Sequence, residues 1–141
     1  MDPLPLVEGD HLQVVRGRVL RVPPSWATPV SADGLVTMTN VRAWGSGVSV
    51  LPDTIDIQLL LRSERSWAVP DQPLFVVGDS AYVFLDSVVA APHPTLRYGR
   101  YSKWDIVGDS LYLRGVDVVC GDAMISTGRS ALDLESRLNA R

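Results

Sequence analysis

The sequence is poor in the residues from which disulfides, metal clusters and membrane spans are built. Of its 141 residues one is cysteine and two are histidine, so neither an intrachain disulfide nor a cysteine metal cluster can form. No apolar stretch reaches the length of about 20 residues that a membrane-spanning helix needs. The sequence therefore predicts a chain without cofactors, metal ions or a membrane span.

The first residues also lack the features of a secretory signal. Residues 1–10 contain neither a basic segment nor a continuous apolar segment. If Met1 is the native start, this predicts a cytoplasmic protein, whereas a removed leader would predict a secreted or cell-surface protein. The sequence leaves the compartment unknown.

The chain also carries no excess of positive charge. Acidic residues outnumber basic ones by 16 to 13, for a net charge of −3. Proteins that hold nucleic acid through its phosphates usually carry an excess of Lys and Arg. The charge balance disfavours a nucleic-acid partner, although a local basic strip is compatible with that total.

Short strand patterns separated by turn residues dominate the rest of the chain. One of them, Leu35–Trp44, is rich in β-branched residues, yet neither of its two alternating faces is purely apolar. Near the C-terminus, Ser130 precedes an apolar stripe at helical spacing and is followed three residues later by Asp133, which predicts a capped helix at about 130–139. The expected strands are 12–22, 35–44, 48–51, 53–62, 74–77, 81–86, 101–107, 111–114 and 116–120.

This pattern predicts a single, mainly β domain over residues 1–141. We expect a small closed or partly open barrel over about 9–122, followed by the C-terminal helix. A β-sandwich is the alternative, because it uses much the same series of short strands.

Several short motifs carry a resemblance to a known group of proteins. They are Gly17-Arg18-Val19, Gly34-Leu35-Val36-Thr37, Val77-Gly78-Asp79 with Phe84-Leu85, Gly99-Arg100-Tyr101 with Lys103-Trp104-Asp105-Ile106-Val107, and Leu134 with Leu138. In these motifs the chain resembles small bacterial, often exported β-barrel domains of no known activity. The resemblance implies a fold similar to the oligonucleotide/oligosaccharide-binding (OB) barrel, and it implies no catalytic residues.

Residues with catalytic potential are scattered. His11 and His93 have no nucleophile and orienting partner at a recognisable spacing, so both are predicted to be surface residues. Metal-ligand spacings, phosphate loops and dinucleotide fingerprints are absent from the sequence. The sequence therefore favours a non-catalytic protein, with no catalytic or metal-binding residues assigned.

Aromatic residues form the most informative pattern. Trp26, Trp44 and Trp67 fall in or beside predicted loops, with Arg65 and other arginines nearby. Such residues either bind a partner or fold back into a satellite core.

We therefore expect a binding or assembly module whose aromatic loops dock on a protein partner or on a second copy of the chain. The alternatives are a domain that binds single-stranded nucleic acid or oligosaccharide on its barrel face, and a small enzyme with a dispersed site, such as His93 with a carboxylate.

Overall fold

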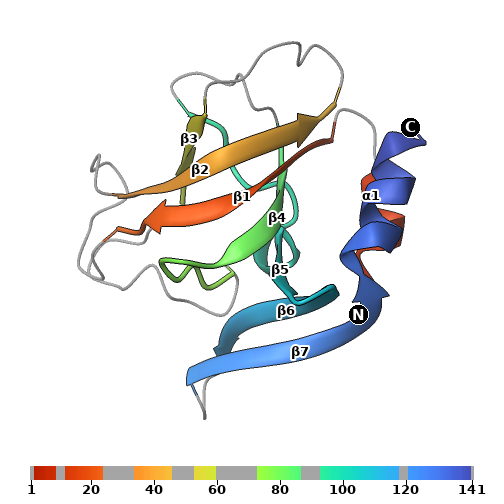
Figure 1. Ribbon diagram of the computed structural model, residues 1–141. Coiled ribbons are helices and arrows are strands. Elements are labelled where there is room, and N and C mark those ends of the chain that lie inside the picture. Colours follow the sequence, from red (N-terminus) through yellow and green to blue (C-terminus); the bar gives the residue numbers. More distant parts are fainter. Residues whose placement is uncertain are drawn as a thin grey trace.

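The protein is described here by a computed structural model covering residues 2–8, 12–23, 34–45, 53–59, 73–86, 93–117 and 121–140, with the backbone alone described at 115–117 and 121–123. Seven strands dominate the described chain, and one α-helix follows them (Figure 1). In order, the elements are η1 (Leu4–Glu8), β1 (Gln13–Arg21), β2 (Leu35–Trp44), β3 (Thr54–Gln58), β4 (Ser80–Leu85), η3 (Gly99–Tyr101), β5 (Lys103–Val107), β6 (Ser110–Asp117), β7 (Gly121–Ser130) and α1 (Ala131–Asn139).

The seven strands form one antiparallel sheet in the order β3-β2-β1-β4-β5-β6-β7. The sheet curls, and residues 94–97 lie between β3 and the end of β4. Gln58 N donates to Pro94 O at 2.9 Å, and Arg97 N donates to Phe84 O at 3.0 Å. The sheet does not close. The mainly β fold with a short C-terminal helix is therefore confirmed, as an open sheet consistent with a partly open barrel or a sandwich.

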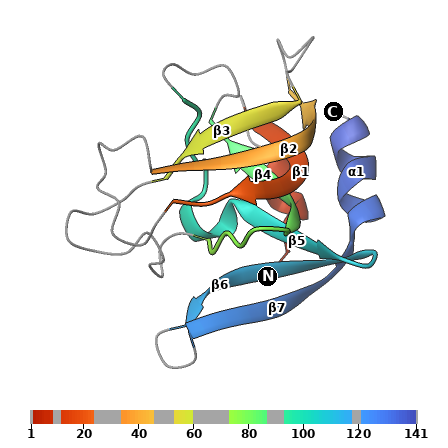
Figure 2. The same ribbon diagram turned by 60° about the vertical axis from the view of Figure 1, so that its left-hand side comes forward.

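The curled sheet has apolar clusters on both of its faces. Residues of β4 alternate between them, so that Val83 and Leu85 belong to one cluster and Tyr82 and Phe84 to the other. The second cluster lies beneath η1 and α1, and α1 stands beside the ends of β1 and β2 in both ribbon views (Figures 1 and 2). Burial on both faces makes β4 the central strand of the fold.

A β-bulge explains the mixed faces of β2. Asn40 has a φ of 55°, and the pairing of β2 with β1 shifts by one residue there, from Arg16↔Arg42 to Arg18↔Thr39. The extra residue reverses the alternation of side chains. Val36 and Met38 before the bulge, and Val41 and Ala43 after it, consequently all pack on the first cluster.

Gly17, on the β1 side of this bulge, has no room for a side chain. An added Cβ would lie 2.9 Å from the carbonyl oxygen of Thr39. The two backbones approach closely here, and glycine is required for that approach.

The C-terminal helix agrees with its prediction. Ser130 Oγ accepts a hydrogen bond from Asp133 N at 3.1 Å, and Asp133 Oδ2 accepts one from Ser130 N at 3.1 Å. This reciprocal pair is the expected capping box. Leu134 and Leu138 are buried against the second cluster, so the apolar stripe docks the helix.

The expected strands near the C-terminus were partly wrong. Residues 116 and 117 continue β6 rather than starting a strand at 116–120, whose residues 118–120 lie outside the described part. The pattern missed β7, since Met124 and Ile125 are both exposed and give no alternation. The sheet thus reaches Ser130, beyond the expected limit near residue 122.

Two further expected strands have other outcomes. Residues 74–77, which were expected to form a strand, form none, because Val76 and Val77 enter a turn closed by Asp79 N donating to Val76 O at 3.0 Å. The expected strand 48–51 lies outside the described residues. In the described part of the chain, no helix has the length and apolar character needed to cross a membrane.

Candidate functional site

A pocket of about 200 Å³ opens where β1, β2 and β4 lie side by side. Three guanidinium groups, one amide and one hydroxyl contribute to its lining, and no carboxylate does. The lining residues are Arg16, Gly17, Arg18, Asn40, Arg42 and Ser80.

The strand pairing brings these side chains together. Arg16 and Arg18 are two residues apart on β1 and therefore project from the same face of the sheet. Arg42 lies directly opposite Arg16 on β2, and Ser80 lies opposite Arg18 on β4. The bulge turns Asn40 and Arg42 toward this face, where the regular register would have placed apolar residues.

Two of the three arginines share a carboxylate from α1. Glu135 Oε1 accepts a hydrogen bond from Arg16 Nη1 at 2.5 Å and lies 3.8 Å from Arg42 Nη1. The Tyr82 hydroxyl donates to the same oxygen at 2.7 Å. Like charges that face each other across two strands are destabilising, so Glu135 offsets the repulsion between Arg16 and Arg42.

These contacts shift the pKa values of both acids. Partial burial opposes ionisation of Glu135, but the hydrogen bonds from Tyr82 and Arg16 outweigh it and lower the pKa of Glu135. Burial, together with the hydrogen bond to Glu135, raises the pKa of Tyr82. At neutral pH the Glu135 carboxylate is therefore charged and the Tyr82 phenol is neutral.

Arg18 is placed differently from the other two. Its side chain is exposed, and within the described ranges no residue forms a hydrogen bond or an ion pair with its guanidinium. Gly78 lies beside it, and a Cβ added there would be in ordinary van der Waals contact with Arg18 Nη2, at 3.9 Å. Arg18 is thus a cation presented to solvent at the rim of the pocket.

Planar guanidinium donors beside a hydroxyl and an amide are a typical environment for phosphate, sulfate or carboxylate. Ligand pockets for drug-sized molecules measure about 300–1,000 Å³. At about 200 Å³, this one has room for a single compact chemical group rather than for a whole large ligand.

Of the predicted partner-binding residues, only Trp44 belongs to the part of the chain that the structure describes. Trp44 is the last residue of β2, where its indole N–H donates to Asn139 Oδ1 at 2.9 Å and Arg42 stacks 4.9 Å from the centre of its ring. It therefore helps to hold α1 beside the pocket. Trp26, Trp67 and Arg65 lie outside the described residues, and their role in partner binding stays a prediction.

Of the residues with catalytic potential, the structure describes only one. His93 is half-buried, and His11 lies outside the described part. Among the described residues, no group of three or more His, Cys, Asp or Glu side chains is placed to hold a metal ion.

Sequence reasoning missed most of the pocket. Arg16, Arg18, Asn40 and Ser80 were not predicted as site residues, and Arg42 was only one of the arginines noted near the tryptophans. The one local signal was the alternation Arg16-Gly17-Arg18, which places two cations on one face of a strand that also carries a close-approach glycine.

A second charged cluster is buried rather than open. Lys103, the only lysine of the chain, is fully buried on β5, with its Nζ 2.8 Å from Asp79 Oδ2, 2.5 Å from Asp105 Oδ1 and 2.8 Å from the carbonyl oxygen of Leu74. Arg114 donates to Asp79 Oδ1 at 2.7 Å. Burial raises the pKa of Asp105, although Lys103 opposes that rise.

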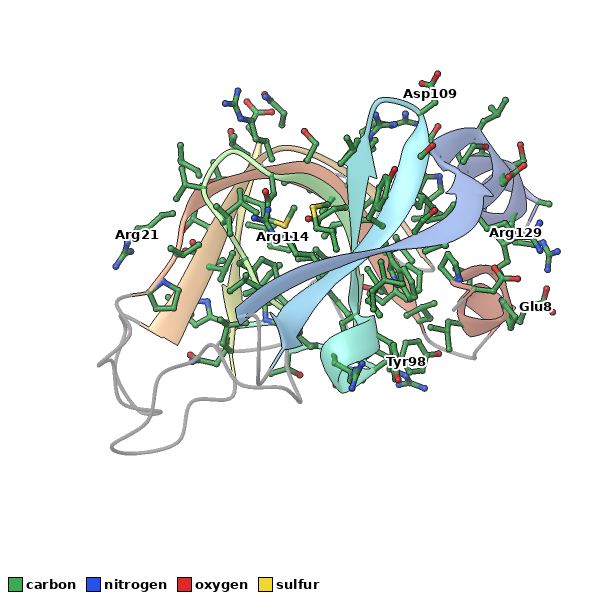
Figure 3. All side chains as sticks on the ribbon, turned by 90° about the horizontal axis from the view of Figure 1, so that it is seen from below. Glu8, Arg21, Tyr98, Asp109, Arg114 and Arg129 are labelled. Atoms are coloured by element: carbon green, nitrogen blue, oxygen red, sulfur yellow. The ribbon has the colours of Figure 1, made fainter. Side chains whose placement is uncertain are left out.

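The buried cluster is an internal ion-pair network that stabilises the fold rather than a ligand site. Figure 3 shows Arg114 toward the middle of the molecule and Arg129 and Glu8 at its rim. Asp79 Oδ2 and the carbonyl oxygen of Leu74 accept hydrogen bonds from the Lys103 ammonium, whereas Asp105 Oδ1 lies beside it in an ion pair without a hydrogen bond. The cluster ties the turn at 76–79 to β5 and β6.

Comparison of the chain with protein families, with curated proteins and with solved structures gives no match. The resemblance to small bacterial β-barrel domains stays a prediction, and the function is argued from the site alone.

Proposed function

We propose that this protein is a non-catalytic binding module that takes one compact anionic group of a larger ligand into the pocket between β1, β2 and β4. The observation that carries the proposal is the lining itself, which includes three arginines and no acidic residue. Phosphate and sulfate groups match this lining best, because each can accept from several guanidinium donors at once. A binding module is the class that the sequence predicts, but the proposed binding residues lie on the sheet and not in the loops.

The lining also supports binding rather than catalysis. Ser80 is the only hydroxyl among the lining residues, and neither a histidine nor a carboxylate lines the pocket to activate it. The neighbouring Glu135 is engaged by Arg16 and Tyr82. The pocket therefore offers positive charge and hydrogen-bond donors without an activated nucleophile.

Titration with inorganic phosphate tests the proposal. Backbone amide shifts in an NMR titration, at ionic strength kept constant with chloride, would report binding residue by residue. We expect shifts centred on Gly17 and Ser80, and we expect Arg18→Ala to weaken binding about tenfold, as for the loss of a charge-assisted hydrogen bond.

Arg100→Ala is the matched control, since Arg100 is exposed and stacks on Tyr101 away from the pocket lining. It removes the same charge and should leave phosphate binding unchanged. Equal losses in the two variants would show a general effect of net charge, and the absence of any shift at the pocket would refute the proposal.

The phosphate group can belong to a small molecule or to a nucleic-acid backbone. The net charge of −3 favours a ligand with one anionic group over a polyanion, whose other phosphates would be repelled. A labelled single-stranded oligonucleotide separates the two sources. Tight, strongly salt-dependent binding of the oligonucleotide that is lost in Arg18→Ala would assign the pocket to nucleic acid. Binding of inorganic phosphate without binding of the oligonucleotide supports the small-molecule source.

A further inference from the structure

β7 forms one end of the sheet and carries exposed apolar side chains. The strand order places β7 beyond β6, and in both ribbon views none of the described elements lies on its outer side (Figures 1 and 2). Met124 is 43% exposed and Ile125 is 51% exposed, and as neighbours on a strand they point to opposite faces. Large apolar side chains on a free edge mark a strand that can pair with another strand.

The centre of β7 lacks the charges and prolines that protect most edge strands. Residues 123–128 contain neither a charged residue nor a proline. At the other end of the sheet, β3 carries the charged Asp56, and Gln58 N donates to Pro94 O at 2.9 Å on its outer side. Of the two end strands in the described sheet, β7 is therefore the one open to pairing.

The backbone of β7 presents hydrogen-bonding groups to the free edge at alternate residues. On β6, the carbonyl oxygen of Arg114 accepts from Leu74 N at 3.3 Å, so the backbone groups of Arg114 point away from β7. Met124 lies opposite Arg114, and its N–H and C=O therefore point outward. The alternation of antiparallel pairing gives Ser126 the same orientation and turns the backbone groups of Ile125 toward β6.

We propose that the outer edge of β7 pairs antiparallel with β7 of a second copy of the chain, about a two-fold axis at Ile125. In this register Met124 of each copy lies opposite Ser126 of the other, and their outward N–H and C=O groups form four backbone hydrogen bonds. The two Ile125 side chains lie directly opposite each other, in a non-hydrogen-bonded pair with Cα atoms about 4.5 Å apart. Both copies use the same groups, as an isologous contact requires.

The absence of charge from residues 123–128 favours a second copy as the partner. In a two-fold contact the segment near the axis faces itself, so a charge there would meet its like, and this segment has none. The contact joins a few residues of each chain, and such small interfaces give weak, concentration-dependent association. The inference is independent of the proposed function, because β5 and β6 separate β7 from the strands that form the pocket.

Sedimentation equilibrium between about 10 µM and about 1 mM tests the self-association. Wild type should shift from the mass of one chain toward that of two over this range. Ile125→Lys places two ammonium groups at the axis and should weaken the dimer at least about tenfold. Leu20→Lys is the matched control, since Leu20 is also exposed, at 56%, but lies on β1. It adds the same charge and should dimerise as wild type does.

A charge exchange tests the position of the axis. Ile125→Glu should dissociate as Ile125→Lys does, whereas an equimolar mixture of the two variants should associate at least about tenfold more tightly than either alone, because Lys faces Glu across the axis. The corresponding mixture of Leu20→Lys and Leu20→Glu should show no such gain. Recovery in the mixture also shows that both Ile125 variants are folded.

Cross-linking gives a second measure of the register. In a Cys120→Ser background, which removes the native thiol, Ile125→Cys should form a covalent dimer with oxidised glutathione, because the expected Cα separation suits a disulfide. Leu20→Cys should stay monomeric under the same conditions. A wild type that remains monomeric at about 1 mM, equal effects of the Ile125 and Leu20 variants, or no gain in the mixed Ile125 variants would overturn the inference.

Discussion

Replacement of Lys103 by methionine probes how the buried charges contribute to stability. Methionine keeps the length and apolar stem of the side chain and removes the ammonium. It leaves Asp79 and Asp105 without the donor that lies 2.8 and 2.5 Å from them, and it leaves the carbonyl of Leu74 without a donor at 2.8 Å. A carboxylate stranded in a buried site is the costly element of this change.

The expected loss of stability depends on how much of the buried negative charge stays compensated in Lys103→Met. Breaking a buried ion pair by removing one partner costs about 3–5 kcal/mol. Arg114 still donates to Asp79 at 2.7 Å and lies 3.8 Å from Asp105, so part of the negative charge stays compensated. We therefore expect a loss of about 3 kcal/mol in the free energy of unfolding, which lowers the Tm of a chain of this size by roughly 10 °C.

Equilibrium unfolding in urea, followed by tryptophan fluorescence, measures this loss. Arg129→Met is the control, because it also removes one cation but breaks an exposed ion pair with Asp2 and should cost much less stability than Lys103→Met. The double variant Lys103→Met/Asp105→Asn removes both charges of one buried pair. It should be less destabilised than the sum of the single variants, by about 2 kcal/mol. A loss below about 1 kcal/mol in Lys103→Met, or strict additivity in the cycle, would refute the reasoning.

Two further predictions concern the pocket and its helix. Gly17→Ala should destabilise the fold by about 1–3 kcal/mol, because the new Cβ would meet the carbonyl oxygen of Thr39 at 2.9 Å and push β1 away from β2. Unfolding in urea measures this loss of stability. An unchanged free energy of unfolding would contradict the close approach of the two strands. Glu135 has a lowered pKa in the folded state, so its ionised form stabilises the fold above the unfolded value near pH 4.5 and this contribution is lost as the pH falls through the folded pKa. The stability gap between wild type and Glu135→Gln should therefore shrink between about pH 7 and pH 3.5, and a gap that stays constant would show that the carboxylate charge contributes nothing.

The pocket illustrates how a fold can place costly charges for use. Arg16 and Arg42 face each other across neighbouring strands, an arrangement that a sheet selected for stability alone would avoid. Asn40 adopts a left-handed conformation in the same place. Such local departures from regular structure are frequent at functional sites, which agrees with the proposal that the pocket binds a ligand.

Much of the secondary structure followed from the local sequence. The valine and other β-branched residues in 12–22 and 35–44 and the turn residues between strands predicted β1 and β2, and Ser130 with Asp133 predicted the start of α1. These features depend on backbone preferences and on capping within a few residues, so a single sequence carries them. The absence of long apolar runs likewise needs no structure to interpret.

The strand β7 and the pocket could not be predicted in this way. Met124 and Ile125 are exposed on both faces of β7, so the strand exists through its pairing with β6 and not through its own pattern. The bulge at Asn40 reverses the faces of β2, and only the pairing of β2 with β1 reveals it.

By itself, the sequence determined a mainly β chain with few reactive residues and one capped C-terminal helix. Only the tertiary structure decided that Arg16, Arg18 and Arg42 share a pocket, that Glu135 reaches it from about 100 residues away along the chain, and that the single lysine is buried. The physical reason is that strand register and helix docking depend on contacts between distant residues, and a local pattern does not encode which distant partner each residue will meet.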